Sequence, residues 1–217
     1  MIRRVAAEAL GTAFLLAIVV GSGIMGEKLA AGNAAVALLA NAIATGAGLF
    51  VLITIFAPIS GAHFNPAVSL AAAISRSLSL KEMLAYIAAQ FVGACVGVLT
   101  AHAMFGLPLL QTSARARSTF GEYLGEVIAT FGLLLTIRLL SRAPVAQVAA
   151  AVALWITAAY WFTSSTSFAN PAVTFARSLT DTFAGIAPNN VAAFIAAQLV
   201  GAALALVVLR ALGESDK

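Results

Sequence analysis

The chain is 217 residues long, and 62% of its residues are hydrophobic while only 9% are charged. Soluble domains carry about 25% charged residues, so this composition excludes a soluble globular protein and predicts a membrane protein. The formal net charge is +4, but the basic residues are scattered at the ends of apolar segments, which argues against a nucleic-acid-binding face or arm.

Six apolar runs are long enough to be membrane-spanning helices, because a span needs about 20 apolar residues. In chain order they cover residues 5–24, 34–57, 82–104, 121–140, 144–162 and 191–212. The first run superficially resembles a signal peptide, but it contains Glu8, is too long for the apolar core of such a peptide and lacks a cleavage site. Pro58 is expected to end the second span, and the polar segment 106–118 is the only connection long enough to join two repeats.

Two shorter helices are predicted between these spans, over residues 65–74 and 170–178. Each begins with Asn-Pro-Ala, in which Asn suits the N-cap and Pro suits the first helical position, where no N–H is needed. The motif residues are Asn65, Pro66 and Ala67 in the first half and Asn170, Pro171 and Ala172 in the second. Both helices are too short to cross a bilayer, so we expect half-helices that stop partway.

The two halves of the chain are predicted to be inverted repeats, residues 1–107 and 108–217. Besides Asn-Pro-Ala, the halves share Ala-Gln-x-Val-Gly-Ala, at residues 89–94 and 197–202, and a glutamate in the first span of each half. Three spans per repeat is an odd number, so the second copy must enter the membrane in the opposite direction. The two half-helices are therefore expected to come from opposite faces.

Charge placement predicts the orientation, because cytoplasmic loops are enriched in Lys and Arg. With both termini inside, the cytoplasmic side carries Arg3, Arg4, Arg76, Lys81, Arg138, Arg142, Arg210 and Lys217. The opposite side then carries Lys28, Arg115, Arg117 and Arg177. We expect a multi-pass protein of the plasma membrane or a bacterial inner membrane, with both termini cytoplasmic.

Two inverted half-helices whose N-termini meet at mid-membrane predict a pore. Their free N–H groups and positive dipole ends converge on one point, and irregular backbone at that depth is tolerated only beside protein or a water-filled cavity. Asn65 and Asn170 would supply side-chain hydrogen-bond donors to the pore there, and the carbonyls of the extended residues before each Asn would supply acceptors. The positive potential where the two N-termini meet repels cations, including hydronium. The arrangement therefore predicts a passive channel for uncharged molecules.

These motifs, together with the sequence His63 to Val68 around the first of them, resemble the major intrinsic protein family, the aquaporins and aquaglyceroporins. The resemblance covers nearly the whole chain. It implies an all-α membrane protein, the aquaporin fold, with six transmembrane helices plus two re-entrant half-helices in two inverted repeats. It also implies a pore through each subunit and a homotetramer.

The resemblance implies a supporting role for Glu8 and Glu126, each accepting hydrogen bonds from the backbone of its half-helix loop. The alternative is a proton or cation relay, since a carboxylate inside a membrane span is a functional candidate. His63 is expected to offer its backbone carbonyl and a fixed side chain to the pore wall, and the alternative is a pH-sensitive gate.

The chain departs from the family at the expected selectivity filter. Most members carry Arg directly after the second Asn-Pro-Ala, where this chain has Val173. Counting from the motifs without gaps places the other filter positions on Thr45, Ala158 and Ser167. Four small uncharged residues predict a wide filter that passes water, glycerol-like polyols and neutral metalloid hydroxides such as arsenous acid. The missing arginine resembles the arsenic-resistance-associated branch of the family.

Arg177 is a possible vestibule residue, because it lies one helical turn beyond Val173 on nearly the same face. In this hypothesis the positive charge of Arg177 replaces the missing charge at position 173 and still influences the entry of solutes into the pore. The alternative is that Arg177 snorkels to lipid headgroups or binds loop carbonyls and Asp181.

Other functions are weighed against this channel. A strict water channel would exclude larger solutes, and a coupled secondary transporter would need a membrane carboxylate free to bind a proton or Na⁺. An ion channel would need rings of charge or a carbonyl filter, and a structural membrane protein would show no permeation. The sequence offers no candidate nucleophile and no phosphate-binding loop that would indicate an enzyme. Its single cysteine, Cys95, cannot form a zinc site by itself, because such a site needs several cysteine ligands. We expect no cofactor or metal, and the partners are small neutral solutes, water and the lipid bilayer.

Overall fold

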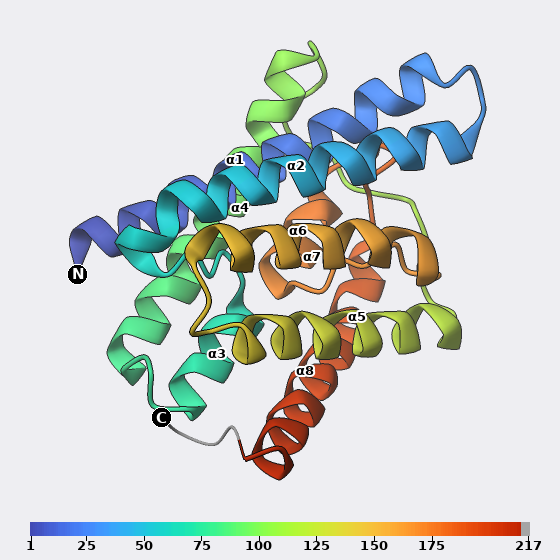
Figure 1. Ribbon diagram of the computed structural model, residues 1–217. Helices are drawn as coiled ribbons and strands as arrows, with labels where there is room; N and C mark the ends of the chain where they lie inside the picture. The colour runs from blue at the N-terminus through green and yellow to red at the C-terminus, as the bar shows by residue number, and fades with distance from the viewer. Residues whose placement is uncertain (214–217) are drawn as a thin grey trace.

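The computed structural model describes residues 1–213, which form helices and loops without a strand (Figure 1). The elements in chain order are α1 (Ile2–Leu29), α2 (Ala34–Ser60), α3 (Pro66–Ile74), α4 (Leu80–Met104), α5 (Phe120–Leu139), α6 (Val145–Phe162), α7 (Pro171–Ala176), the 3₁₀-helix η1 (Arg177–Leu179) and α8 (Pro188–Ala211). Six of them, α1, α2, α4, α5, α6 and α8, are long and apolar enough to cross a membrane. The predicted all-α membrane fold is confirmed.

Several helix boundaries differ from the prediction: α1 runs from Ile2 to Leu29 rather than over 5–24, and a proline lies near two other boundaries that differ. Pro58 does not end α2, which continues for two more residues to Ser60. Its C-cap is Gly61, whose φ of 90° is left-handed and whose N–H still reaches the carbonyl of Ala57. At the other end of the chain, α8 begins earlier than expected, with Pro188 in its first turn.

The short helices begin as predicted, with Asn65 and Asn170 as N-caps of α3 and α7. The second is not a single helix over 170–178, because α7 is followed directly by the 3₁₀ turn η1, which begins at Arg177. This change of helix type turns the chain after the half-helix. It also determines where the side chain of Arg177 points.

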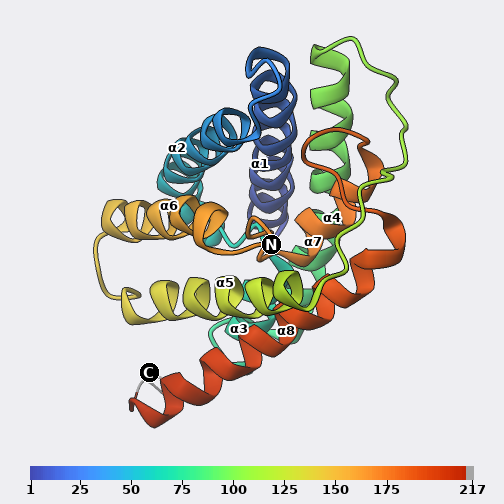
Figure 2. The ribbon, with the colours of Figure 1, turned by 90° about the vertical axis from the view of Figure 1, so that its right-hand side faces the viewer.

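The long helices pack in equivalent pairs. α1 contacts α2 and α4, α5 contacts α6 and α8, and α2 contacts α6 across the two halves. The half-helices α3 and α7 contact each other, and each also contacts both α4 and α8 (Figure 2). The two short helices are therefore enclosed by spanning helices, which is the position a pore-forming segment requires.

The closest helix contacts depend on glycines in the repeated Val-Gly-Ala sequence. A Cβ at Gly93 of α4 would lie 2.2 Å from the carbonyl oxygen of Ala9 in α1. A Cβ at Gly201 of α8 would lie 2.3 Å from the carbonyl oxygen of Val127 in α5. Only glycine allows these backbones to approach so closely.

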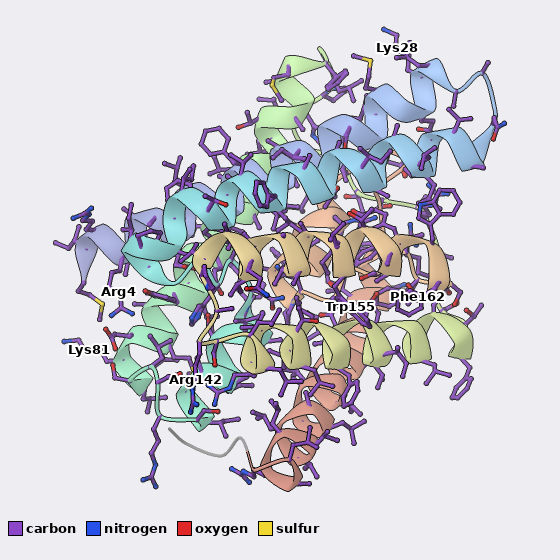
Figure 3. The ribbon with its side chains drawn as sticks, in the orientation of Figure 1. Arg4, Lys28, Lys81, Arg142, Trp155 and Phe162 are labelled. Carbon is purple, nitrogen blue, oxygen red and sulfur yellow. The ribbon has the colours of Figure 1, made fainter. Side chains whose placement is uncertain are left out.

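Basic side chains at the two ends of the helices are unequally distributed. Figure 3 shows Arg4, Lys81 and Arg142 at the end where the chain begins, and Lys28 at the opposite end. This is the arrangement on which the predicted cytoplasmic orientation of the termini rests. One residue of that count, Lys217, lies outside the described residues.

Gly93→Ala is expected to destabilise the protein by about 1–3 kcal/mol, because the added methyl carbon overlaps a backbone oxygen that has no room to move. The measurement is thermal unfolding of the purified protein in detergent. The matched control is Gly21→Ala in α1, where the nearest heavy atom to the new Cβ lies at 3.4 Å. Equal melting temperatures for the two variants would contradict the close-packing role of Gly93.

Candidate functional site

The two Asn-Pro-Ala motifs meet and hold each other by a reciprocal pair of hydrogen bonds. The side-chain amide of Asn65 donates to the carbonyl of Ala169 at 2.7 Å, and that of Asn170 donates to the carbonyl of Phe64 at 2.8 Å. Each Asn oxygen also accepts an N–H from the first turn of its own half-helix. The motif that begins one half-helix is thus bonded to the loop that precedes the other.

Two buried glutamates hold the loops that lead into these motifs. Glu8 of α1 accepts the backbone N–H groups of His63 at 3.0 Å and Phe64 at 2.7 Å. Glu126 of α5 accepts those of Phe168 and Ala169, both at 2.8 Å. Both carboxylates are 0% exposed, and each serves the two residues directly before its Asn. These bonds agree with the supporting role expected for the glutamates, and they leave little of either carboxylate for binding an ion.

Two glutamines complete this arrangement, and the sequence reasoning did not assign them a role. Gln90 donates from Nε2 to Glu8 at 2.9 Å and to the hydroxyl of Ser69 in α3 at 2.9 Å. Gln198 donates from Nε2 to Glu126 at 2.6 Å and to the hydroxyl of Thr174 in α7 at 2.7 Å. The signal was present, because both glutamines belong to the repeated Ala-Gln-x-Val-Gly-Ala. A polar side chain repeated inside an apolar span indicates a bonded partner.

The loop backbone is held in an uncommon conformation at equivalent positions. Ala62 and Phe64 before the first motif have φ of 51° and 48°, and Ser167 and Ala169 before the second have φ of 51° and 48°. Left-handed conformations of non-glycine residues cost free energy and persist only where their surroundings hold them. The hydrogen bonds to the two carboxylates supply that constraint.

A cavity of about 700 Å³ runs past the junction of the two motifs. Its wall includes both motif asparagines and residues of α1, α2, α3, α5, α6 and α7. At one end the lining includes Ser77, Ser141 and Arg142, and at the other it includes Thr45, Tyr160 and Arg177. We call the second group's location the Arg177 end of the cavity.

Three of the four predicted filter residues lie in the wall of the cavity, and the fourth does not. Thr45, Ser167 and Val173 line it. The prediction for Ala158 is wrong, because its side chain is on the exposed face of α6 and is absent from the lining. α6 turns about 100° per residue, so its lining residues recur every fourth position and Ala158 falls on the opposite face.

Tyr160 takes the inward position on α6 that Ala158 was expected to have. It is buried and lines the cavity, and its phenolic oxygen lies 3.2 Å from the hydroxyl of Thr45 on α2. The Arg177 end of the cavity therefore has an aromatic wall that the gapless count from the motif did not find. The residues of α6 that line the cavity include 152, 156 and 160, and the structure rather than the sequence shows that this face points inward.

Arg177 lies in the wall of the cavity and does not point to lipid. Its side chain is 2% exposed, and its guanidinium carbon lies 3.4 Å from the centre of the Phe168 ring. Its Nε donates to the carbonyl of Ala184, so the predicted contact with a loop carbonyl is present. The predicted contact with Asp181 is not, because that carboxylate accepts the backbone N–H of Ala114.

A second arginine supports the same ring from the segment that connects the two halves. Arg117 places its guanidinium carbon 4.9 Å from the Phe168 ring centre and donates to the carbonyls of Gly185 and Ser165. Burial, followed by the nearby Arg115, lowers the pKa of Arg117 to about 10, so the group keeps its charge at neutral pH. The connecting segment is therefore part of the cavity's surroundings as well as a linker.

His63 lines the cavity near the first motif, with both its backbone and its ring held in place. Its backbone N–H donates to Glu8, and its Nδ1 lies 3.0 Å from the hydroxyl of Ser69. The ring stands edge-on to Tyr86 with centroids 5.4 Å apart. These contacts fit the fixed side chain expected of His63. Residues 1–213 contain no cluster of His, Cys, Asp and Glu that could hold a metal ion.

Comparison with known proteins identifies what this arrangement is similar to. The family model for the Major intrinsic protein matches residues 1–144. Aquaglyceroporin AqpS of Rhizobium meliloti (strain 1021) is 53% identical over 208 residues, which cover 96% of this chain and 89% of the relative. Probable aquaporin TIP2-2 of Oryza sativa subsp. japonica is 34% identical over 133 residues, which cover 60% of this chain and 54% of the relative.

A solved structure has the same fold. The X-ray structure of the aquaglyceroporin from Plasmodium falciparum superposes with a TM-score of 0.76, covering 96% of this chain and 95% of that chain at 21% sequence identity. The relatives are named as channel proteins rather than enzymes, in agreement with the expectation from the sequence. The resemblance to the arsenic-resistance-associated branch stays a prediction.

Glu126→Leu is expected to lower the melting temperature strongly and to abolish permeation. It leaves the N–H groups of Phe168 and Ala169 buried without an acceptor, and each unpaired buried donor costs about 1–3 kcal/mol. Thermal unfolding in detergent and flux into proteoliposomes measure the two effects. Glu126→Gln, which keeps one acceptor oxygen, should be intermediate, and Glu27→Leu at an exposed site of α1 is the control. A Glu126→Leu variant as stable as that control would contradict the supporting role.

Proposed function

Because the chain belongs to the major intrinsic protein family, we propose that it is a passive transmembrane channel for water and small uncharged solutes. The observation that carries this proposal is the cavity between the half-helices, with Asn65 and Asn170 both in its wall. Each asparagine amide has two N–H groups, and the bond across the motif junction uses one of them. The other can donate to a passing solute.

The junction also explains why such a channel would favour neutral molecules. The N-termini of α3 and α7 meet there, so their positive dipole ends face the same point of the pore. A cation would lose its hydration shell against this positive field, whereas a hydroxylated neutral solute exchanges hydrogen bonds with water for bonds with the wall.

We propose a filter at the Arg177 end that is wide at residue 173. Val173, Ser167 and Thr45 line this part of the cavity with short uncharged side chains. The absence of an arginine at position 173 leaves space beside the second motif, which supports passage of glycerol-like polyols and neutral metalloid hydroxides such as arsenous acid along with water. The name of the relative AqpS, an aquaglyceroporin, supports water and glycerol-like solutes.

A coupled transporter is less well supported, because the two carboxylates inside spans, Glu8 and Glu126, are engaged by backbone and glutamine donors. We further propose that the halves 1–107 and 108–217 act as inverted repeats, since the equivalent bonds of the two glutamates and two glutamines match across them. The channel would work as a homotetramer in the cell membrane with both termini cytoplasmic.

Stopped-flow light scattering on proteoliposomes tests the proposal with water, glycerol and arsenous acid. The wild type should pass all three faster than empty liposomes. Val173→Arg should suppress glycerol and arsenous acid flux more than water flux, because a long side chain fills the space at the filter; about tenfold would correspond to an added barrier of about 1.4 kcal/mol.

The outcomes separate three functions. Fast water flux with glycerol and arsenous acid excluded from the wild type would replace this proposal with a strict water channel. A saturable flux that depends on a proton or Na⁺ gradient would indicate a transporter. Absence of any flux above empty liposomes would contradict the channel itself.

A further inference from the structure

The Arg177 end of the cavity combines an open position at residue 173 with a buried positive charge one helical turn away. Arg177 belongs to η1, which directly follows α7, and its side chain is 2% exposed yet lines the cavity. A guanidinium group is protonated at any physiological pH, so this part of the wall carries a permanent charge. Because the side chain is buried in protein, solvent screens that charge weakly.

The guanidinium is held on one side and free of protein partners on the other. The Phe168 ring at 3.4 Å and the carbonyl of Ala184 fix its position. Among residues 1–213, none supplies a hydrogen-bond partner for its two terminal nitrogens. Those nitrogens are four N–H donors beside the cavity, available to water or to an oxygen-bearing solute.

No carboxylate forms an ion pair with Arg177 within the described part of the chain, although the buried Glu126 is near enough to attract its guanidinium. The ion pair found there joins Arg4 to Glu82, at the end of the protein where the chain begins. Asp181, four residues after Arg177, is exposed and bonds to the backbone of Ala114. Arg117 adds a second positive group against the same Phe168 ring. Two guanidinium groups without an ion-pair partner therefore lie against Phe168 at this end of the cavity.

An independent polar group lies in the same part of the wall. Ser167 is 3% exposed and lines the cavity, and its hydroxyl oxygen has no hydrogen-bond partner among the described residues. A buried hydroxyl without a protein partner is costly unless water or a solute bonds to it. Together with the guanidinium it provides both donors and an acceptor for a hydroxylated neutral molecule.

We propose that Arg177 is the charge-selecting residue of this channel, so that cation exclusion and pore width, which a single filter arginine combines in the family pattern, are divided here between Arg177 and Val173. Arg177 repels cations and donates hydrogen bonds to the oxygens of neutral solutes. Val173 leaves the pore wide enough for those solutes. This inference rests on the proposed channel function.

The test measures two quantities on the same proteoliposomes: glycerol flux by stopped-flow light scattering, and proton and K⁺ leak by a trapped pH-sensitive dye and by current across planar bilayers. The wild type should show glycerol flux with leak at the level of empty membranes. Arg177→Met removes the charge but keeps an unbranched stem against Phe168. It should raise the ratio of cation leak to glycerol flux by on the order of tenfold or more, since a weakly screened charge in the cavity wall is a large barrier to cations.

Three variants make the result specific to charge and position. Arg177→Lys keeps a positive group and should hold the leak ratio near the wild-type value. Val173→Arg should reduce glycerol flux without raising the leak. Lys28→Gln removes an exposed basic side chain of α1 away from Phe168 and should leave the ratio unchanged. Glycerol flux in the Arg177 and control variants, and water flux in Val173→Arg, show that each channel is folded and inserted.

Two results would overturn the inference while leaving the channel function intact. The first is an Arg177→Met variant that passes glycerol and has the same ratio of cation leak to glycerol flux as the wild type. This result would assign cation exclusion to the half-helix dipoles. The second is an Arg177→Lys variant as leaky as Arg177→Met, which would assign the effect to packing against Phe168. If the wild type itself passes no glycerol, the proposed function fails, and this inference fails with it.

Discussion

The pore depends on two carboxylates that are buried inside membrane spans and are each bonded to a strained loop. Glu8 and Glu126 accept the N–H groups of the two residues before each motif asparagine, and these residues include Phe64 and Ala169 in the left-handed conformation. Irregular backbone at membrane depth needs such partners, because lipid supplies none. Without the carboxylates the carbonyls of both loops would lose their direction, and the half-helices would have no fixed point at which to meet.

The constraint acts on both halves at once, because the loops are also bonded to each other. Asn65 donates to the loop before the second motif, and Asn170 donates to the loop before the first. A shift in one loop therefore changes the acceptor of the other asparagine. Rigidity of this kind suits a passive channel, in which the wall stays in place while the solute moves. It is less suited to a transporter, which must rearrange around its substrate.

The two ends of the cavity differ although the halves share their supporting bonds. The supporting residues occur in matched pairs, but Arg177 and Tyr160 give one end a charged and aromatic wall. The difference comes from what surrounds the half-helices rather than from the motifs. η1 turns the chain after α7, and the long connecting segment brings Arg117 against Phe168. The proposed selectivity residues thus lie where the equivalence of the two halves ends, whereas the matched residues support the loops.

The sequence by itself determined the membrane class, the six spans, the two half-helices and the identity of the motifs, because these follow from local hydropathy and from cap chemistry at Asn-Pro-Ala. It did not determine every side chain that faces the cavity, although Thr45, Ser167 and Val173 were expected there and do line it. Ala158 was expected to face it and instead lies on the exposed face of α6, because the facing of a helix depends on its rotation against α2 and α5. The direction in which the Arg177 side chain points and the hydrogen-bond partners of Gln90 and Gln198 were likewise decided only by tertiary structure. Their contacts join residues far apart in the chain or depend on how the loops fold back, and neither hydropathy nor spacing along the chain specifies such contacts.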